Sequence, residues 1–369
     1  MKTKTERIEL PGETNFHISE PIQSRIVDPL AQLLDSAGSG DEDTGLVDRN
    51  GFSESCFLFG EIKSVETRLK SPRRELINLY PIDSNKYLVK IAFKDGSNLG
   101  AIVSFIASAK NEAMVFSSPL KYRTRSWKKK TISSVRYYYQ DSLNEKIAES
   151  FVRKNEEIAE KFGLAAKKLN YFKCSNYDEV QWVLGIDYDA KSAGTVQSSE
   201  SFDNTIITGL NTENFEHDVF HMYIESEFPS GEDRNFIAEE GYANSIADAY
   251  YAKINGDVIT RNELTGCLRE YLAENSEADL LQLFQKDPRV FHPLSEEVSQ
   301  EVFDLLSVRS TITSLFCDEV ERLNGFEGII KLLRCGEGED AYFKALDDLI
   351  GVNKTNFDKT AKELVARKN

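Results

Sequence analysis

The pattern of apolar and polar positions changes along the chain. Apolar residues recur with helical spacing from Ile22 to Leu34, and a stretch rich in Gly, Ser and Asp follows over residues 36–54, which predicts a helix and then a loop. Residues 75–119 contain short β-rich runs separated by turn signals. This part of the chain therefore predicts helices followed by an antiparallel sheet.

Helical spacing returns in the second part of the chain. The pattern predicts an amphipathic helix over 141–162, a strand over 168–174 and a helix over 178–184. An apolar run follows at 204–209, and beyond Ala238 almost every segment has the helical pattern. We therefore expect strands and helices to share a domain here, with a mostly helical C-terminal half.

Length and composition favour two domains. The 369 residues, of which 40% are hydrophobic, suffice for two packed cores. We expect an α+β fold, with an N-terminal helix-plus-antiparallel-sheet domain over 1–130 and a second domain over 133–369. In the order of its elements, the N-terminal domain resembles the small cone-shaped domains of the nuclear-transport-factor-two-like class.

The chain is acidic, with a formal net charge of −16. This charge opposes binding to phosphate backbones and anionic membranes, so we expect no nucleic-acid partner. Bases alternate with aromatics from Lys121 to Lys130, a pattern also typical of surfaces that bind single-stranded nucleic acid. In so acidic a chain we favour a solvated edge or linker at the domain boundary.

The cysteines and the first residues bear on the cellular setting. The five cysteines are scattered and include no CxxC pair, so neither a thiolate metal site nor a dense disulfide framework is predicted. Residues 1–7 lack the apolar core of a signal peptide, and no apolar run is long enough to predict a transmembrane helix. The sequence leaves open a periplasmic or secreted location, if a signal peptide has been removed, or a cytoplasmic one, and it does not indicate the oligomeric state.

One segment carries the spacing of a metal site. Residues 216–224 predict a helix with His217 and His221 one turn apart on the same face. Two imidazoles at this spacing can both coordinate a tetrahedral Zn²⁺ at about 2.0–2.1 Å and leave positions for a carboxylate and a water. Glu240 follows, with eighteen residues between it and His221, and precedes Gly241 in the next predicted helix.

This arrangement resembles the His-Glu-x-x-His, eighteen residues, Glu-Gly pattern of the gluzincins, the thermolysin-like and aminopeptidase-N-like zinc metallopeptidases of the peptidase MA clan. The resemblance covers about the C-terminal two-thirds of the chain. The helix that ends at Lys161, the Ala193-Gly194 pair and the strand at Ile206 look like the family's approach to its active helix, and residues 311–333 resemble its helical lid. The resemblance implies that Glu240 is the third zinc ligand and that the substrate is a peptide or protein.

Two positions depart from the family pattern. Asp218 stands where the family has a Glu that acts as general base. Asp keeps the carboxylate but is one methylene shorter, and catalysis is sensitive to displacements of about 1 Å. A rough alignment places Arg309 or Ser310 where the family has a Tyr or His that stabilises the oxyanion. Arg309 can donate to an oxyanion, or it can pair with a surface carboxylate, the commoner fate of an Arg in an acidic chain.

Neighbouring residues have weaker assignments. Asn244 lies on the face of Glu240 and either hydrogen-bonds a ligand histidine or is exposed. Glu239 points about 100° away from Glu240 on the helix, towards solvent or a substrate amine. The remaining histidines and the tyrosines of the motif helices are expected to be packed or exposed without contacting metal: His17, His292, Tyr223, Tyr242, Tyr250 and Tyr251.

These observations support a leading hypothesis and two others. The first is zinc-dependent hydrolysis of peptide bonds, with Zn²⁺ held by His217, His221 and Glu240 and with Asp218 acting as base and then acid. The alternative is a catalytically inactive gluzincin-like protein that binds zinc or a partner. In a third hypothesis the N-terminal sheet domain is the recognition module of an envelope-associated binding protein.

Overall fold

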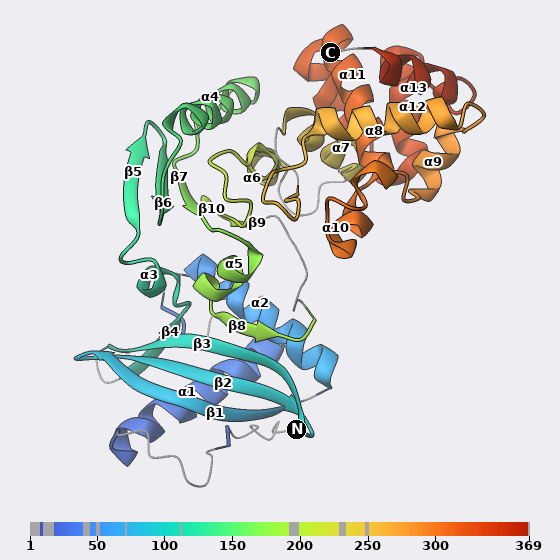
Figure 1. The fold of residues 1–369 in the computed structure, drawn as a ribbon. Helices are drawn as coiled ribbons and strands as arrows, with labels where there is room; N and C mark the ends of the chain where they lie inside the picture. The colour runs from blue at the N-terminus through green and yellow to red at the C-terminus, as the bar shows by residue number, and fades with distance from the viewer. Residues whose placement is uncertain are drawn as a thin grey trace. The chain divides into compact units, whose positions relative to one another are not determined.

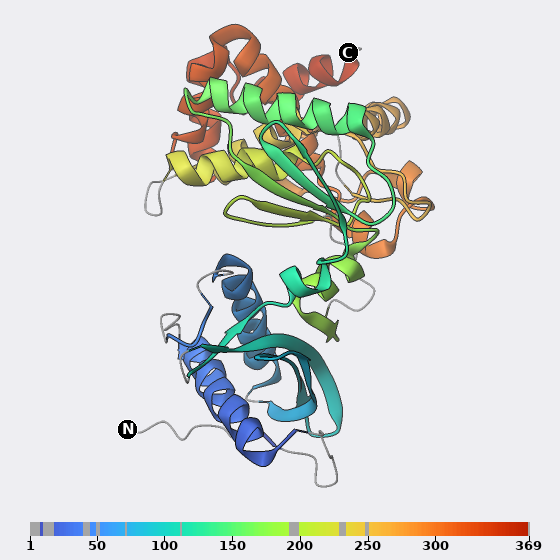
Figure 2. The ribbon, with the colours of Figure 1, turned by 90° about the vertical axis from the view of Figure 1, so that its left-hand side faces the viewer.

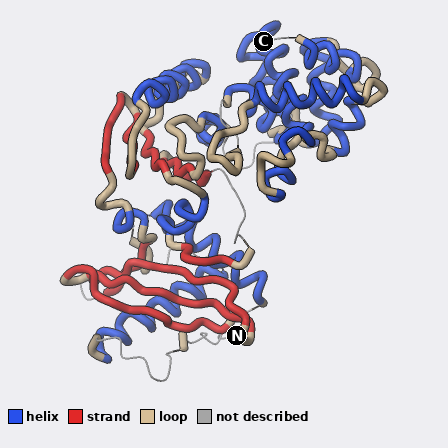
Figure 3. Tube along the Cα trace, in the orientation of Figure 1, coloured by secondary structure: helices blue, strands red, loops and turns tan. Residues whose placement is uncertain are grey.

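The computed structural model describes residues 8–9, 18–39, 45–48, 52–70, 72–110, 113–191, 199–228, 234–247 and 251–367. The chain divides into two compact units, residues 1–128 with 178–195 and residues 129–177 with 196–369. Each unit combines helices with a sheet, as Figure 3 shows in blue and red. The expected mixture of helices and antiparallel strands in an α+β chain is thereby confirmed at this coarse level.

The first unit is a five-stranded sheet with two long helices packed against it (Figure 1). Neighbouring strands run antiparallel in the order β1-β2-β3-β4, and β8 pairs antiparallel with β3. The helices bury apolar residues such as Leu30 and Ile62 against Phe93 and Phe105 of the sheet. The elements are α1 (Glu20–Ser39), α2 (Phe52–Leu69), β1 (Arg73–Asp83), β2 (Lys86–Asp95), β3 (Asn98–Lys110), β4 (Ala113–Ser117), α3 (Leu120–Arg123), α5 (Tyr177–Leu184) and β8 (Ile186–Asp189).

A charged cluster attaches β8 to the rest of this sheet. Asp187 on β8 accepts hydrogen bonds from Lys90 Nζ at 2.5 Å, Ser104 Oγ at 2.7 Å and Arg123 Nη2 at 2.7 Å. Burial opposes ionisation of Asp187, but the charge of Arg123 and these hydrogen bonds outweigh it and lower its pKa. Residues 178–195, which the sequence patterns placed in the second domain, therefore belong to the first unit.

The segment from Lys121 to Lys130 is ordered and in part buried. Residues 120–123 form α3, and β5 begins at Lys128. The Arg123 and Trp127 side chains lie inside, at 9% and 7% exposure. The two units divide at Lys128, inside this segment, and Lys121, Arg125 and Lys129 are exposed as expected. The expectation fails for Arg123 and Trp127, because Asp187 supplies a buried partner for Arg123 that local sequence cannot reveal.

The second unit is a five-stranded mixed sheet with helices, in the order β5-β6-β7-β10-β9 (Figure 2). Strand β7 runs parallel to both β6 and β10. Strand β9 lies at the end of the sheet and pairs antiparallel with β10. Its elements are β5 (Lys128–Ile132), β6 (Val135–Tyr139), α4 (Glu145–Lys161), β7 (Leu169–Lys173), β9 (Ser199–Phe202), β10 (Thr205–Thr208), α6 (Glu216–Glu227), α7 (Phe236–Ile246), α8 (Arg261–Glu274), α9 (Leu280–Lys286), the short 3-10 helix His292–Leu294, α10 (Gln300–Leu305), α11 (Val308–Leu333), α12 (Gly338–Ile350) and α13 (Phe357–Ala366).

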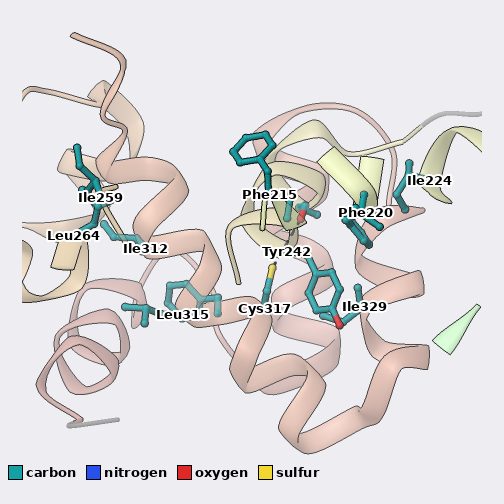
Figure 4. Close-up of a cluster of buried hydrophobic side chains, with 14 of the residues drawn as sticks. Phe215, Phe220, Ile224, Tyr242, Ile259, Leu264, Ile312, Leu315, Cys317 and Ile329 are labelled. Carbon is teal, nitrogen blue, oxygen red and sulfur yellow. Dashed lines mark hydrogen bonds between the residues drawn. The ribbon is translucent and has the colours of Figure 1, made fainter. Parts of the chain in front are cut away.

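The apolar core of this unit holds the two helices of the motif in place. Figure 4 shows Phe220 of α6 and Tyr242 of α7 among buried side chains that include Cys317 of α11. The rings of Phe220 and Tyr242 meet edge to face with centroids 5.0 Å apart. Among the described residues, no helix is both long enough and apolar enough to cross a membrane.

Candidate metal centre

Helices α6 and α7 bring the three predicted ligands together. His217 and His221 lie one turn apart near the start of α6, and Glu240 lies in α7. The start of α7 is anchored by Asn235, whose side chain accepts from Ala238 N at 3.1 Å and donates to Gly336 O at 2.7 Å. One ligand atom from each of the three residues lies within 4.8 Å of the other two.

The donor separations suit a tetrahedral ion. His217 Nε2 and His221 Nε2 are 3.1 Å apart, and the Glu240 carboxylate oxygens lie 3.6 Å from the first and 3.5 Å from the second. Ligands at about 2.0–2.1 Å from a tetrahedral Zn²⁺ lie about 3.3–3.4 Å from one another. The distances between the three donor atoms are therefore close to those expected around a tetrahedral Zn²⁺.

The next layer of residues orients the imidazoles. His221 Nδ1 lies 2.8 Å from Glu239 Oε1, and Arg234 Nε lies 3.2 Å from Glu239 Oε2. The side chain of Asn244 acts to raise the pKa of His217. Both Glu239 and Asn244 are buried, at 3% and 2% exposure, so the expected solvent contact of Glu239 is wrong, and Asn244 is not the exposed helix residue that was its alternative.

The pKa values of the two imidazoles are shifted in opposite directions. Burial, followed by the charge of His221, lowers the pKa of His217 to about 3. Burial also acts to lower the pKa of His221, but the hydrogen bond to Glu239 and the charges of Glu240, Glu239 and Asp218 raise it overall. At neutral pH the His217 imidazole is therefore uncharged. The carboxylates around His221 favour the protonated, positively charged form of its imidazole.

Asp218 accepts a hydrogen bond from the neighbouring edge strand, β9. Ser199 Oγ on β9 donates to Asp218 Oδ2 at 2.7 Å. Burial raises the pKa of Asp218, and the hydrogen bonds from Ser199 and Ser201 act in the opposite direction. Asp218 is therefore a half-buried carboxyl group with a raised pKa, next in the chain to His217.

The glycine after Glu240 allows two helices to approach closely. A Cβ atom on Gly241 would lie 2.7 Å from Thr313 Cβ on α11 and closer still to Thr313 Cγ2. Contacts under about 3 Å are rarely tolerated in a packed interior. Gly241 therefore sets how near α7, which carries Glu240, lies to α11.

The structure engages Arg309 elsewhere. Its guanidinium donates to Phe284 O at 2.8 Å and Gln285 O at 2.7 Å, and Cζ lies 5.5 Å from the Phe284 ring centroid. These contacts attach α9 to α11 and give no support to an oxyanion role. The alternative Ser310 donates its backbone N–H to the helix cap Ser307 at 3.0 Å.

The remaining candidate aromatics and histidines fall into three groups. Tyr223 donates its hydroxyl to Asn155 Oδ1 and Tyr242 to Glu321 Oε2, each at 2.8 Å, as packed core residues do. His292 is exposed on the 3-10 helix. The following lie outside the described residues: His17, Tyr250 and the Ala193-Gly194 pair.

Tyr251, Arg234 and Ser199 extend the site beyond the sequence motif. Tyr251 follows the end of α7, and its pKa is raised by burial and then by the charges of Glu240 and Asp218. Tyr251 was named from the sequence as a tyrosine of the motif helices, but it lies beyond α7, which ends at Ile246. Arg234 carried a weak signal, as a base just before a helix start, and Ser199 depends on a strand that meets α6 in space.

Comparison with known proteins identifies no family model, no curated protein and no solved structure that matches this chain.

Proposed function

We propose that this protein is a zinc-dependent peptide hydrolase with a gluzincin-like site. The observation that carries the proposal is the spacing of His217 Nε2, His221 Nε2 and the Glu240 carboxylate, which are 3.1–3.6 Å apart. Two nitrogen donors with one carboxylate, leaving one tetrahedral position open, form the usual ligand set of catalytic zinc. The ligand side chains are 18%, 21% and 50% exposed, so water and substrate have access to the open position.

Each protein group has a distinct task in this proposal. Zn²⁺ bound here would act as a Lewis acid and lower the pKa of a coordinated water to about 7. The Asp218 carboxylate would accept the proton of the attacking water and return it to the leaving amine. Glu239 and Asn244 would keep the two imidazoles in the orientation that presents Nε2.

The edge of the sheet provides a place for the substrate. β9 is the last strand in the order, and Ser199 on this strand contacts Asp218. Extended peptides commonly bind by adding a strand to a sheet edge, where their main-chain groups form hydrogen bonds. A peptide that pairs with β9 would run past Asp218, which favours a peptide or protein substrate.

Metal analysis combined with Asp218 variants tests this function. We expect one Zn²⁺ per chain, and little zinc in His217→Ala. Asp218→Asn keeps an oxygen acceptor for Ser199 but removes the proton acceptor, so cleavage of a diverse peptide library should fall by about 10²–10⁴-fold while zinc stays bound. Glu149→Gln, an exposed change on α4, is the matched control and should leave both measurements unchanged.

Asp218→Glu separates the two principal hypotheses. If wild type cleaves peptides, Asp218→Glu will change the rate of cleavage. The rate will rise if the shorter Asp side chain weakens the natural site, and it will fall if the pocket has adapted to Asp. If wild type and both Asp218 variants bind zinc and none cleaves any peptide, the catalytically inactive alternative replaces the proposal. The engagement of Arg309 by α9 favours that alternative. Zinc that remains below one per chain after dialysis against ZnCl₂ would refute the metal site itself.

A further inference from the structure

The first unit contains a polar cleft that has no part in the metal centre. It lies between the β1–β2 turn, the ends of β3 and β4, and helix α3, and its volume is about 680 Å³. All of its lining residues belong to residues 1–128. Clefts of about 300–1,000 Å³ are the usual size for small-molecule sites.

Basic side chains outnumber acidic ones in this cleft. Its lining includes four bases, Lys86, Lys110, Lys121 and Arg125, and two acids, Asp48 and Asp83. Asp48 is paired with Lys110, whose Nζ lies 2.8 Å from Oδ1. Asp83 accepts from Ser84 N at 2.7 Å. A net positive cleft is unusual in this chain, because the two units together carry a charge of −16.

Three donors in the lining are available to an incoming anion. Lys86 and Ser108 are direct cross-strand partners on β2 and β3. Within the described residues, neither side chain has a hydrogen bond or ion pair. Ser108 is 6% exposed, so its hydroxyl lies in the wall of the cleft.

Arg125 provides the third donor and is already oriented. Its Cζ lies 3.8 Å from the Tyr122 ring centroid, and Nη1 donates to Tyr122 O at 3.4 Å. Within the described part of the chain, its guanidinium contacts no carboxylate. A stacked guanidinium with free N–H groups matches the two-oxygen face of a carboxylate or phosphate.

We infer that this cleft binds a small organic anion whose carboxylate or phosphate group is held by Lys86, Ser108 and Arg125. The volume of the cleft, about 680 Å³, is large enough to hold a compact anion of this kind. The inference is independent of the proposed peptidase activity, because no lining residue belongs to the second unit.

Calorimetric titration of the full-length protein with pyrophosphate and with citrate tests the inference and separates the two anion chemistries. We expect at least one of the probes to bind with Kd below about 1 mM, and binding to weaken as salt is raised. Arg125→Gln and Lys86→Gln should each raise Kd about tenfold or more, with Arg125→Lys falling between wild type and Arg125→Gln. Lys63→Gln, an exposed change on α2 outside the cleft, should bind as wild type does.

A second arm excludes chelation at the metal centre. His217→Ala should bind each probe with the affinity of wild type, since residue 217 lies in the other unit. The inference is overturned if neither probe binds with Kd below about 1 mM. It is equally overturned if His217→Ala abolishes binding, or if the cleft variants retain both their thermal midpoint and wild-type affinity.

Discussion

Two consecutive glutamates contact opposite sides of one imidazole: Glu239 Oε1 lies 2.8 Å from His221 Nδ1, and Glu240 Oε1 lies 3.5 Å from His221 Nε2. The first contact assigns the proton to Nδ1 when the ring is neutral, which leaves the Nε2 lone pair for a metal. Glu239 is buried and faces Arg234, whereas Glu240 is half exposed. The two carboxylates therefore differ: Glu239 is the buried partner of His221 Nδ1, and Glu240 is the half-exposed carboxylate near Nε2.

The first prediction follows from this division. Glu239→Ala should weaken zinc binding about 10–100-fold, as expected for loss of a group that orients a ligand. Glu240→Ala should weaken it further, because a ligand itself is lost. Competition against a chromophoric chelator measures both affinities, with Glu225→Ala on the exposed side of α6 as the control. Equal losses for the two glutamates would show that the wrong carboxylate has been assigned as ligand.

The second prediction concerns pH and the attachment of the last helix. Glu319 on α11 accepts hydrogen bonds from Arg322 Nη2 at 2.7 Å and from Arg367 Nη1 at 2.9 Å. The hydrogen bond from Arg322 is the largest effect on the pKa of Glu319; burial opposes it, and the hydrogen bond from Arg367 and the charges of both arginines add to it, so that the pKa falls from 4.5 to about 2. Since the folded pKa is the lower one, this stabilisation is complete above about pH 4.5 and is lost as the pH falls towards about 2.

Glu319→Gln should therefore lower the thermal midpoint near neutral pH, and the difference from wild type should shrink as the buffer is taken below pH 4.5. Both arginines are more than half exposed, so we expect the variant to lose less than about 1 kcal/mol of the free energy of unfolding. The thermal midpoint should therefore fall by less than roughly 2–4 °C. Glu327→Gln on the same helix, at an exposed position, serves as the control. A difference that grows on acidification would contradict the assigned sign.

Local patterns were sufficient for the elements that carry the motif. The predicted helices around His217 and beyond Ala238 correspond to α6 and α7, and the predicted strands at 168–174 and 204–209 contain β7 and β10. Each is specified by its own periodicity and by nearby helix or turn signals. The helical spacing of His217 and His221 likewise follows from sequence alone.

Features that depend on distant partners were not predictable in this way. β8 joins the first sheet by pairing with β3, and Ala101 is the partner of Asp189 across a long sequence separation. Ser199 reaches Asp218 only because β9 folds back on β10. Arg309 faces the carbonyls of α9, which no spacing rule relates to the motif. Nuclear-transport-factor-two-like architecture in the first unit and gluzincin layout in the second both stay predictions.

The last prediction tests why a glycine follows the ligand Glu240. Gly241→Ala would place a methyl group 2.7 Å from Thr313 Cβ, so α7 must move away from α11. Overpacking of this kind costs about 1–3 kcal/mol, and the displacement of α7 also carries Glu240 away from the histidines. We expect a lower thermal midpoint together with weaker zinc binding. Thr313→Ser in the same chain removes the nearest methyl group and should restore part of both losses.

Gly266→Ala is the matched control, because Gly266 lies inside α8 and a Cβ there would meet no atom within 4 Å. Alanine in an open helical position is favoured over glycine by roughly 0.5–1 kcal/mol, so this variant should be slightly more stable and bind zinc as wild type does. If Gly241→Ala were stabilised as well, the close approach of α7 to α11 would be absent. If it lost stability but kept full zinc affinity, Gly241 would serve packing alone, because the position of Glu240 would not depend on it.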